Sequence, residues 1–168
     1  MRRIGVAIAL AVFLSLSATM PATAAVVFKP DALIDGPNTS NYLGDGQYND
    51  DGSQQTTNAR VSLGEVARFR IKFQNDGEMT DDMLVKGCKG SRKFKVTYKL
   101  DGDKVTAAVT AGNHSVPLDT SEESEKPLFL AVKVLEPANK GDTKNCKVTA
   151  TAQDGSASDT VLATGKVR

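Results

Sequence analysis

The chain has no tryptophan, one histidine and two cysteines among its 168 residues, and aromatic residues make up only 5% of it. With His114 as the single imidazole, no His-Glu-x-x-His zinc site can form. The sequence also lacks a Gly-x-Ser-x-Gly nucleophile elbow, a P-loop and a Gly-x-Gly-x-x-Gly fingerprint. These absences predict a protein that is not an enzyme and for which no cofactor is expected.

An excess of charge of one sign is also missing. The chain has 21 basic and 20 acidic residues, a formal net charge of +1. Nucleic-acid-binding domains are usually strongly basic. We therefore expect no nucleic-acid partner.

Long apolar runs are absent except at the N-terminus. Arg2 and Arg3 precede an apolar run over residues 4–16, and Ala22-Thr23-Ala24 provides the small residues of a cleavage site. Residues 1–24 are predicted to be a secretion signal peptide. The apolar run is shorter than the roughly 20 residues that span a bilayer. The expected product is residues 25–168, secreted to the extracellular side without a membrane anchor.

The two cysteines, Cys88 and Cys146, are an even number in a chain with an export signal, which predicts one disulfide. In the chain-entropy model, closing a loop of this length stabilises the fold by about 4 kcal/mol. The alternative is a zinc site formed with His114. It lacks the closely spaced ligand pairs that such sites use.

Hydrophobic residues alternate with polar ones along most of the chain, as in half-buried strands. Around residues 66–73, for example, Phe69, Ile71 and Phe73 would face inward and the cations between them outward. No segment after residue 25 shows a helical period. Glycine-, proline- and asparagine-rich turns separate the expected strands, which lie near residues 30–34, 55–61, 66–74, 82–87, 93–100, 104–109, 114–118, 128–135, 144–151 and 159–167.

Ten short strands are too many for one open twisted sheet, and two packed sheets bury them better. With turns about every ten residues, the pattern favours an all-β, immunoglobulin-like, two-sheet antiparallel sandwich formed by residues 25–168 as one domain. The tryptophan that packs on the disulfide of antibody domains is absent.

Several segments together resemble a recurring module of bacterial extracellular proteins. It is similar to the cell-adhesion-related immunoglobulin-like domains of bacteria, which occur as repeats in large secreted or surface proteins. The resemblance implies the same fold and no catalytic residues, and the module is present here as a single copy. The segments that carry it are residues 30–34, 42–49, 69–77, 85–88, 94–98 and 105–109.

The segment from Gly36 to Gln54 is long and polar and has no strand period. It contains four side chains with oxygen ligands of the kind that calcium prefers, although their spacing differs from that of an EF-hand loop. The alternative is an ordinary turn-rich loop. The candidate metal ligands are Asp45, Asn49, Asp50 and Asp51.

Cations recur at every second position in two of the expected strands. If these strands lie in one sheet, the cations form an outer face that could hold an anionic polymer through many weak contacts. A solvated face that keeps strands from aggregating would use the same residues. The cations of this expected face are Arg68, Arg70, Lys72, Lys93, Lys95 and Lys99.

The sequence therefore predicts a secreted, non-catalytic binding or interaction module at or outside the cell surface. Its expected partner classes are a cell-wall polymer, a polysaccharide or another surface protein. Two alternatives remain open: a purely structural envelope component, and a small secreted hydrolase or an inhibitor.

Overall fold

The computed structural model describes residues 27–37, 39, 41–124 and 126–168. The expected signal peptide, residues 1–24, and the start of the domain at residue 25 lie outside the described residues. None of the helices that the structure describes is long and apolar enough to span a membrane.

The described chain forms ten strands and one short helix. Strands are found where the alternation of apolar residues predicts them, with one exception near residue 106. The elements are β1 Pro30–Asp35, β2 Thr56–Val61, β3 Val66–Asn75, β4 Asp81–Gly87, β5 Phe94–Leu100, β6 Asp103–Lys104, α1 Thr106–Ala111, β7 His114–Leu118, β8 Leu128–Val134, β9 Thr143–Thr151 and β10 Ser158–Val167.

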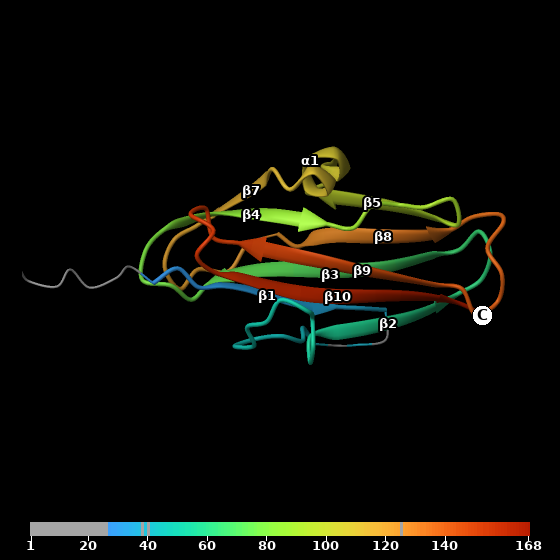
Figure 1. The fold of residues 1–168 in the computed structure, drawn as a ribbon, viewed down its shortest axis with the longest axis horizontal. Coiled ribbons are helices and arrows are strands. Elements are labelled where there is room, and N and C mark those ends of the chain that lie inside the picture. Colours follow the sequence, from blue (N-terminus) through green and yellow to red (C-terminus); the bar gives the residue numbers. More distant parts are fainter. Residues whose placement is uncertain (1–26, 38, 40, 125) are drawn as a thin grey trace, which may run out of the picture.

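The strands form two five-stranded sheets that face each other (Figure 1). One sheet has the order β1-β3-β8-β5-β6, and the other has the order β2-β10-β9-β4-β7. This arrangement is an immunoglobulin-like β-sandwich, as the sequence predicts. The expectation of purely antiparallel sheets needs one correction, because β2 pairs with β10 in parallel.

The inward side chains of the two sheets form one core. In β3, Phe69 and Ile71 are completely buried and Phe73 is 2% exposed, so the predicted alternation is confirmed. The opposite sheet contributes residues such as Val85, Val148 and Val161, which are also fully buried. The burial of these apolar side chains is the main force that holds the two sheets together.

The expected strand at residues 104–109 is mostly a helix, which corrects the sequence-based prediction. Only Lys104 lies in a strand, and α1 follows it. Val109, one helical turn after Val105, is completely buried. Gly112 ends the helix in the left-handed conformation, and its N–H donates to the carbonyls of Ala108 and Val109. Two adjacent alanines favour this helix. In the sequence, the glycine that ends it is indistinguishable from a glycine in a turn between two strands.

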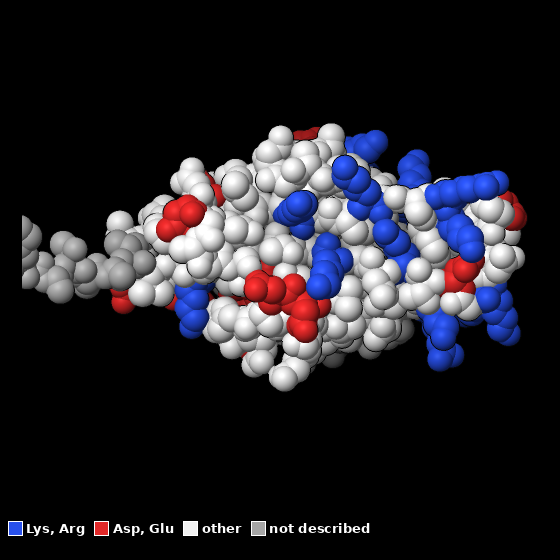
Figure 2. Space-filling view, viewed as in Figure 1, with Lys and Arg blue, Asp and Glu red and all other residues white. Residues whose placement is uncertain are grey.

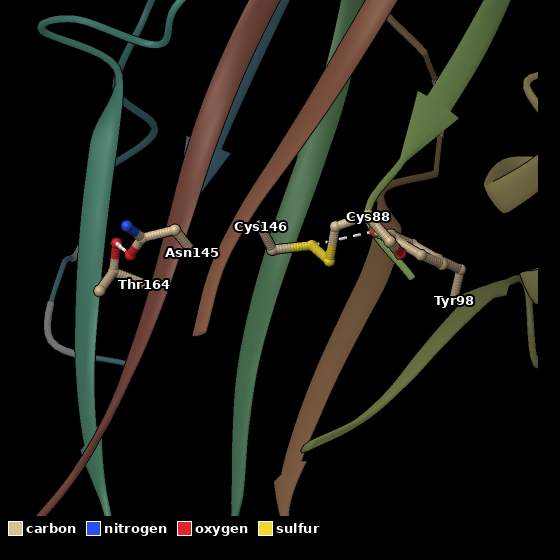
Figure 3. The surroundings of a disulfide bond; sticks show 5 residues. All are labelled: Cys88, Tyr98, Asn145, Cys146 and Thr164. Atoms are coloured by element: carbon tan, nitrogen blue, oxygen red, sulfur yellow. Dashed lines mark hydrogen bonds between the residues drawn. A yellow bond between two sulfur atoms is a disulfide. The ribbon is translucent and has the colours of Figure 1, made fainter. Parts of the chain in front are cut away.

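A disulfide joins Cys88, just after β4, to Cys146 in β9, and their Cα atoms are 5.1 Å apart. It lies within one sheet, because β4 and β9 are neighbours. Tyr98 approaches it from β5 of the opposite sheet (Figure 3). The Tyr98 hydroxyl donates to the Cys88 carbonyl at 3.2 Å and lies 3.1 Å from the Cys146 Sγ. Tyr98 therefore covers the disulfide in this domain, which has no tryptophan.

Charge is distributed unevenly along the sandwich. Lys and Arg side chains gather over the half of the molecule that carries the C-terminus (Figure 2). Turns rich in Lys and Arg meet at that end: Leu135 N–H donates to the Lys93 carbonyl, and Gly141 N–H donates to the Val167 carbonyl. On the face shown, Lys and Arg are thus concentrated toward one end of a chain that is nearly neutral in total.

Candidate anion-binding face

The outer face of the sheet β1-β3-β8-β5-β6 contains most of the cations that the sequence suggested. β3 and β5 are not neighbours, because β8 lies between them and pairs with both. The register aligns the outward residues in three rows across the sheet. These rows are Val66, Lys133 and Lys95; then Arg68, Ala131 and Thr97; then Arg70, Phe129 and Lys99.

In the middle row, Ala131 and Thr97 have small side chains, whereas the rows on either side contain long ones, so the sheet surface is lower at these two residues. A groove of about 380 Å³ lies there, lined by residues from all three strands. Phe129 forms one wall of the groove, and its side chain is 43% exposed. The groove therefore combines an aromatic surface with a ring of cations.

Four cations border this groove: Arg68, Lys95, Lys99 and Lys133. Each is exposed, and within the described part of the chain none of them forms an ion pair. Like charges placed on neighbouring strands repel one another. An anion over Ala131 would relieve that repulsion. We name these four cations with Phe129 and Ala131 the groove face.

The other three predicted cations are engaged elsewhere. Arg70 forms an ion pair with Asp35, and Lys72 forms one with Glu123. Lys93 binds Asp142 at 2.8 Å. The Asn139 N–H and Lys93 together lower the pKa of Asp142. Arg70, Lys72 and Lys93 are thus neutralised by carboxylates far away in the sequence and contribute little free charge to the face.

Sequence reasoning missed Lys133 and Phe129. Both lie at outward positions of β8, and the alternation of that strand was visible in the sequence. What the sequence could not provide is the strand order, which places β8 between the two cationic strands. Only this order brings Lys133 and Phe129 into the candidate site.

Three of the four metal ligands suggested in the long loop accept hydrogen bonds from the protein itself. Asn49 Oδ1 accepts from Gly52 N–H at 2.6 Å, and Asp51 Oδ1 accepts from Ser53 N–H at 2.8 Å. Asp50 accepts a hydrogen bond from Ser158. The Asp45 side chain is exposed. Over the residues that the structure describes, no three Asp, Glu, His or Cys side chains surround a common point.

His114 begins β7 and is half-buried. It lines a mostly apolar cleft of about 400 Å³ together with residues such as Phe73 and Leu128. Its Nε2 atom is buried without a hydrogen-bond partner in the described residues, and burial lowers the pKa of the ring. Within the described part of the chain, no serine, cysteine or carboxylate forms a hydrogen bond with that nitrogen.

Comparison with known proteins finds similarity of fold alone. No family model and no curated protein matches the chain. A family 123 glycoside hydrolase from Clostridium perfringens is 13% identical with a TM-score of 0.51, covering 83% of this chain and 27% of that one. The N-terminal domain of PorA is 13% identical with a TM-score of 0.46, covering 82% of this chain and 97% of that one.

A CARDB domain from Pyrococcus furiosus, solved in complex with di-metal ions, is 12% identical with a TM-score of 0.40, covering 86% of this chain and 97% of that one. The chain spans about a quarter of the length of the Clostridium hydrolase. At these identities the comparisons describe an architecture that many unrelated functions share. The chain is therefore similar to these proteins as a β-sandwich and is assigned to no family by them.

Proposed function

We propose that this protein is a secreted, non-catalytic binding module whose groove face holds an acidic polysaccharide outside the cell. The observation that carries the proposal is a ring of four exposed cations around Phe129 and Ala131, none of which has an ion-pair partner among the described residues. Secretion is supported by the N-terminal sequence pattern and by the disulfide, which is typical of oxidising compartments.

The choice of ligand class follows from the chemistry of the groove. Lys and Arg attract carboxylates, and an array of separate cations suits a polymer with repeated negative charges. The exposed ring of Phe129 offers an apolar surface for the face of a sugar ring. A uronic-acid polymer provides both features in each repeat.

A purely structural role in the cell envelope is the second candidate. The disulfide, with Tyr98 packed on it, supports this role because it makes the fold resistant to unfolding. A structural role would not require cations without ion-pair partners around an exposed aromatic ring. We therefore place it second.

The test measures retention of purified residues 25–168 on immobilised polygalacturonate at low salt, with neutral dextran as the reference. We expect retention on the acidic polymer only, falling steeply as salt shortens the screening length to about 8 Å at physiological ionic strength. The double variant Arg68→Glu/Lys95→Glu should lose most of this retention, because it reverses two charges beside the groove.

The matched control is Lys140→Glu/Lys166→Glu, which changes the net charge equally at exposed positions away from the groove. It should keep most of the retention. If the two double variants weaken binding equally, the attraction is a property of overall charge. If the unchanged protein is not retained at low salt, the proposed function is wrong.

A further inference from the structure

Three buried polar side chains lie beneath the turn at residues 44–47, on a different part of the molecule from the groove face. Asp31 comes from β1, Gln55 directly precedes β2, and Asp159 comes from β10. Each is 0% exposed. Polar groups buried this completely are expensive unless all of their hydrogen bonds are made.

Asp159 is fully used. Its two oxygens accept from the Ala32 N–H at 2.8 Å, the Asn49 N–H at 2.9 Å and the Gln55 side-chain amide at 2.8 Å. The same Gln55 amide nitrogen donates to the Gln47 carbonyl at 2.8 Å. The donors of this cluster are thus occupied, and they hold the loop backbone against the sandwich.

Two acceptor oxygens remain without a partner in the described residues: Asp31 Oδ1 and Gln55 Oε1. Both side chains contact the same turn, because Asp31 Oδ2 accepts from the Gly46 N–H at 2.8 Å and the Gln55 amide bonds to Gln47. A Cβ atom placed on Gly44 would lie 2.7 Å from Gln55 Oε1 and 2.7 Å from the Ala32 carbonyl oxygen. Oxygen atoms therefore crowd around this turn.

Negative charge is concentrated at the same place. Burial raises the pKa of Asp31 to about 7, and the carboxylates of Asp159, Asp76 and Asp45 also raise it, against the opposing hydrogen bond from the Gly46 N–H. Lys29, which precedes β1, lies over the Tyr48 ring, with its Nζ 4.0 Å from the ring centroid. Among the residues that the structure describes, no hydrogen-bond donor and no ion-pair partner is matched to Asp31 Oδ1 or Gln55 Oε1.

We propose that one calcium ion binds under this turn, with Asp31 Oδ1 and Gln55 Oε1 as protein ligands and backbone carbonyl oxygens and water completing its shell. The atoms available as metal ligands at this turn are oxygens, which hard cations prefer. A side-chain amide and an irregular turn suit the flexible coordination of Ca²⁺ better than the strict octahedron of Mg²⁺. This proposal does not depend on the proposed polysaccharide binding.

With one carboxylate as a direct ligand, the affinity should lie in the range of extracellular calcium modules, about 10⁻⁴ to 10⁻³ M. The ion would sit at the base of the long loop. The four loop side chains that the sequence suggested as ligands are not needed. The ion would help to fix residues 44–49, whose backbone forms hydrogen bonds with Asp31, Gln55 and Asp159.

Terbium provides a direct probe, because Tb³⁺ replaces Ca²⁺ and emits when a nearby aromatic ring absorbs light. The chain has no tryptophan, and Tyr48 lies close enough to Asp31 and Asp45 for their charges to act on its pKa. We expect tyrosine-sensitised Tb³⁺ emission that excess Ca²⁺ abolishes and that the Tyr48→Phe variant largely loses. At 10 mM, CaCl₂ should raise the Tm by about 4–7 °C, whereas MgCl₂ should have a much smaller effect.

Asp31→Asn should lose both the emission and the calcium-dependent rise in Tm. The substitution keeps the shape of the side chain and adds an N–H donor, so the domain should still fold. The matched control is Asp103→Asn in exposed β6, which should behave like the unchanged protein. If the unchanged protein shows neither signal up to 10 mM, the two free oxygens are satisfied by water or by a proton on Asp31, and the proposal is overturned. Equal binding by Asp31→Asn would also overturn it.

Discussion

At the scale of single residues, buried carboxylates connect loops to the sandwich. Asp35 is 1% exposed at the end of β1 and accepts hydrogen bonds from Thr39 and Arg70. Burial alone would raise the pKa of Asp35, but the Thr39 and Arg70 hydrogen bonds and the positive charge of Arg70 bring it below its usual value. The ionised form is therefore favoured in the folded state.

Replacing Asp35 by Asn should lower the free energy of unfolding by about 1–2 kcal/mol at pH 7, a modest value because Arg70 is half exposed. Since folding lowers this pKa, its stabilisation is present above the pKa of the unfolded chain, near 4, and disappears as the pH falls further. Urea unfolding at pH 7 and at pH 3 should show the difference between the two proteins shrinking. A difference that stays constant across this range would contradict the ion-pair interpretation.

At the scale of elements, the disulfide and β5 support each other across the core. The Tyr98 hydroxyl satisfies the Cys88 carbonyl, and a Cβ atom on Gly87 would lie only 2.4 Å from that hydroxyl oxygen. The ends of β4 and β5 thus meet at a contact with no spare space. The sequence predicts the disulfide from cysteine count and compartment, but it does not show that Tyr98 covers it.

Replacing Tyr98 by Phe should lower the free energy of unfolding by about 1–2 kcal/mol, because the Cys88 carbonyl would lose its donor while the ring still fills the core. Thermal unfolding monitored by circular dichroism would measure the loss. Tyr48→Phe is the comparison, because the Tyr48 hydroxyl donates to Asp76 on an exposed side chain, where losing a hydrogen bond should cost less than in the core. If the two substitutions lower the free energy of unfolding equally, the hydrogen bond from Tyr98 to the Cys88 carbonyl contributes no more than an exposed one.

Loss of the disulfide itself should cost more. The Cys88→Ser/Cys146→Ser double variant should be about 4 kcal/mol less stable, because the unfolded chain regains the freedom of a loop of 58 residues. Chemical denaturation of the disulfide-bonded protein and of the double variant would measure this difference. A loss below about 1 kcal/mol would mean that the unfolded chain gains little freedom when the disulfide is absent.

Local sequence patterns predict the elements well because alternation of apolar and polar residues reflects burial directly. This explains why β3, β5 and β8 are found close to their expected bounds. The same reasoning fails at α1, where the burial of Val109 and the capping by Gly112 depend on contacts rather than on alternation. A six-residue helix is too short to give a clear period of its own.

At the scale of the whole molecule, the candidate site depends on how the strands are ordered. The sequence predicts the outward cations of β3 and β5, but not that β8 lies between them. It also could not reveal that Asp35, Glu123 and Asp142 neutralise three of the six expected cations. These partners come from distant parts of the chain. Pairing of this kind arises only when the fold brings them together.

The most direct test of the groove face is to map binding residue by residue by NMR. Titrating isotope-labelled protein with an oligogalacturonate at low salt should shift the amide signals of β3, β8 and β5, and those of Arg68, Phe129, Ala131 and Lys133 most strongly. The opposite sheet, β2-β10-β9-β4-β7, should remain almost unchanged. Shifts spread evenly over both faces, or no shifts at all, would contradict the account.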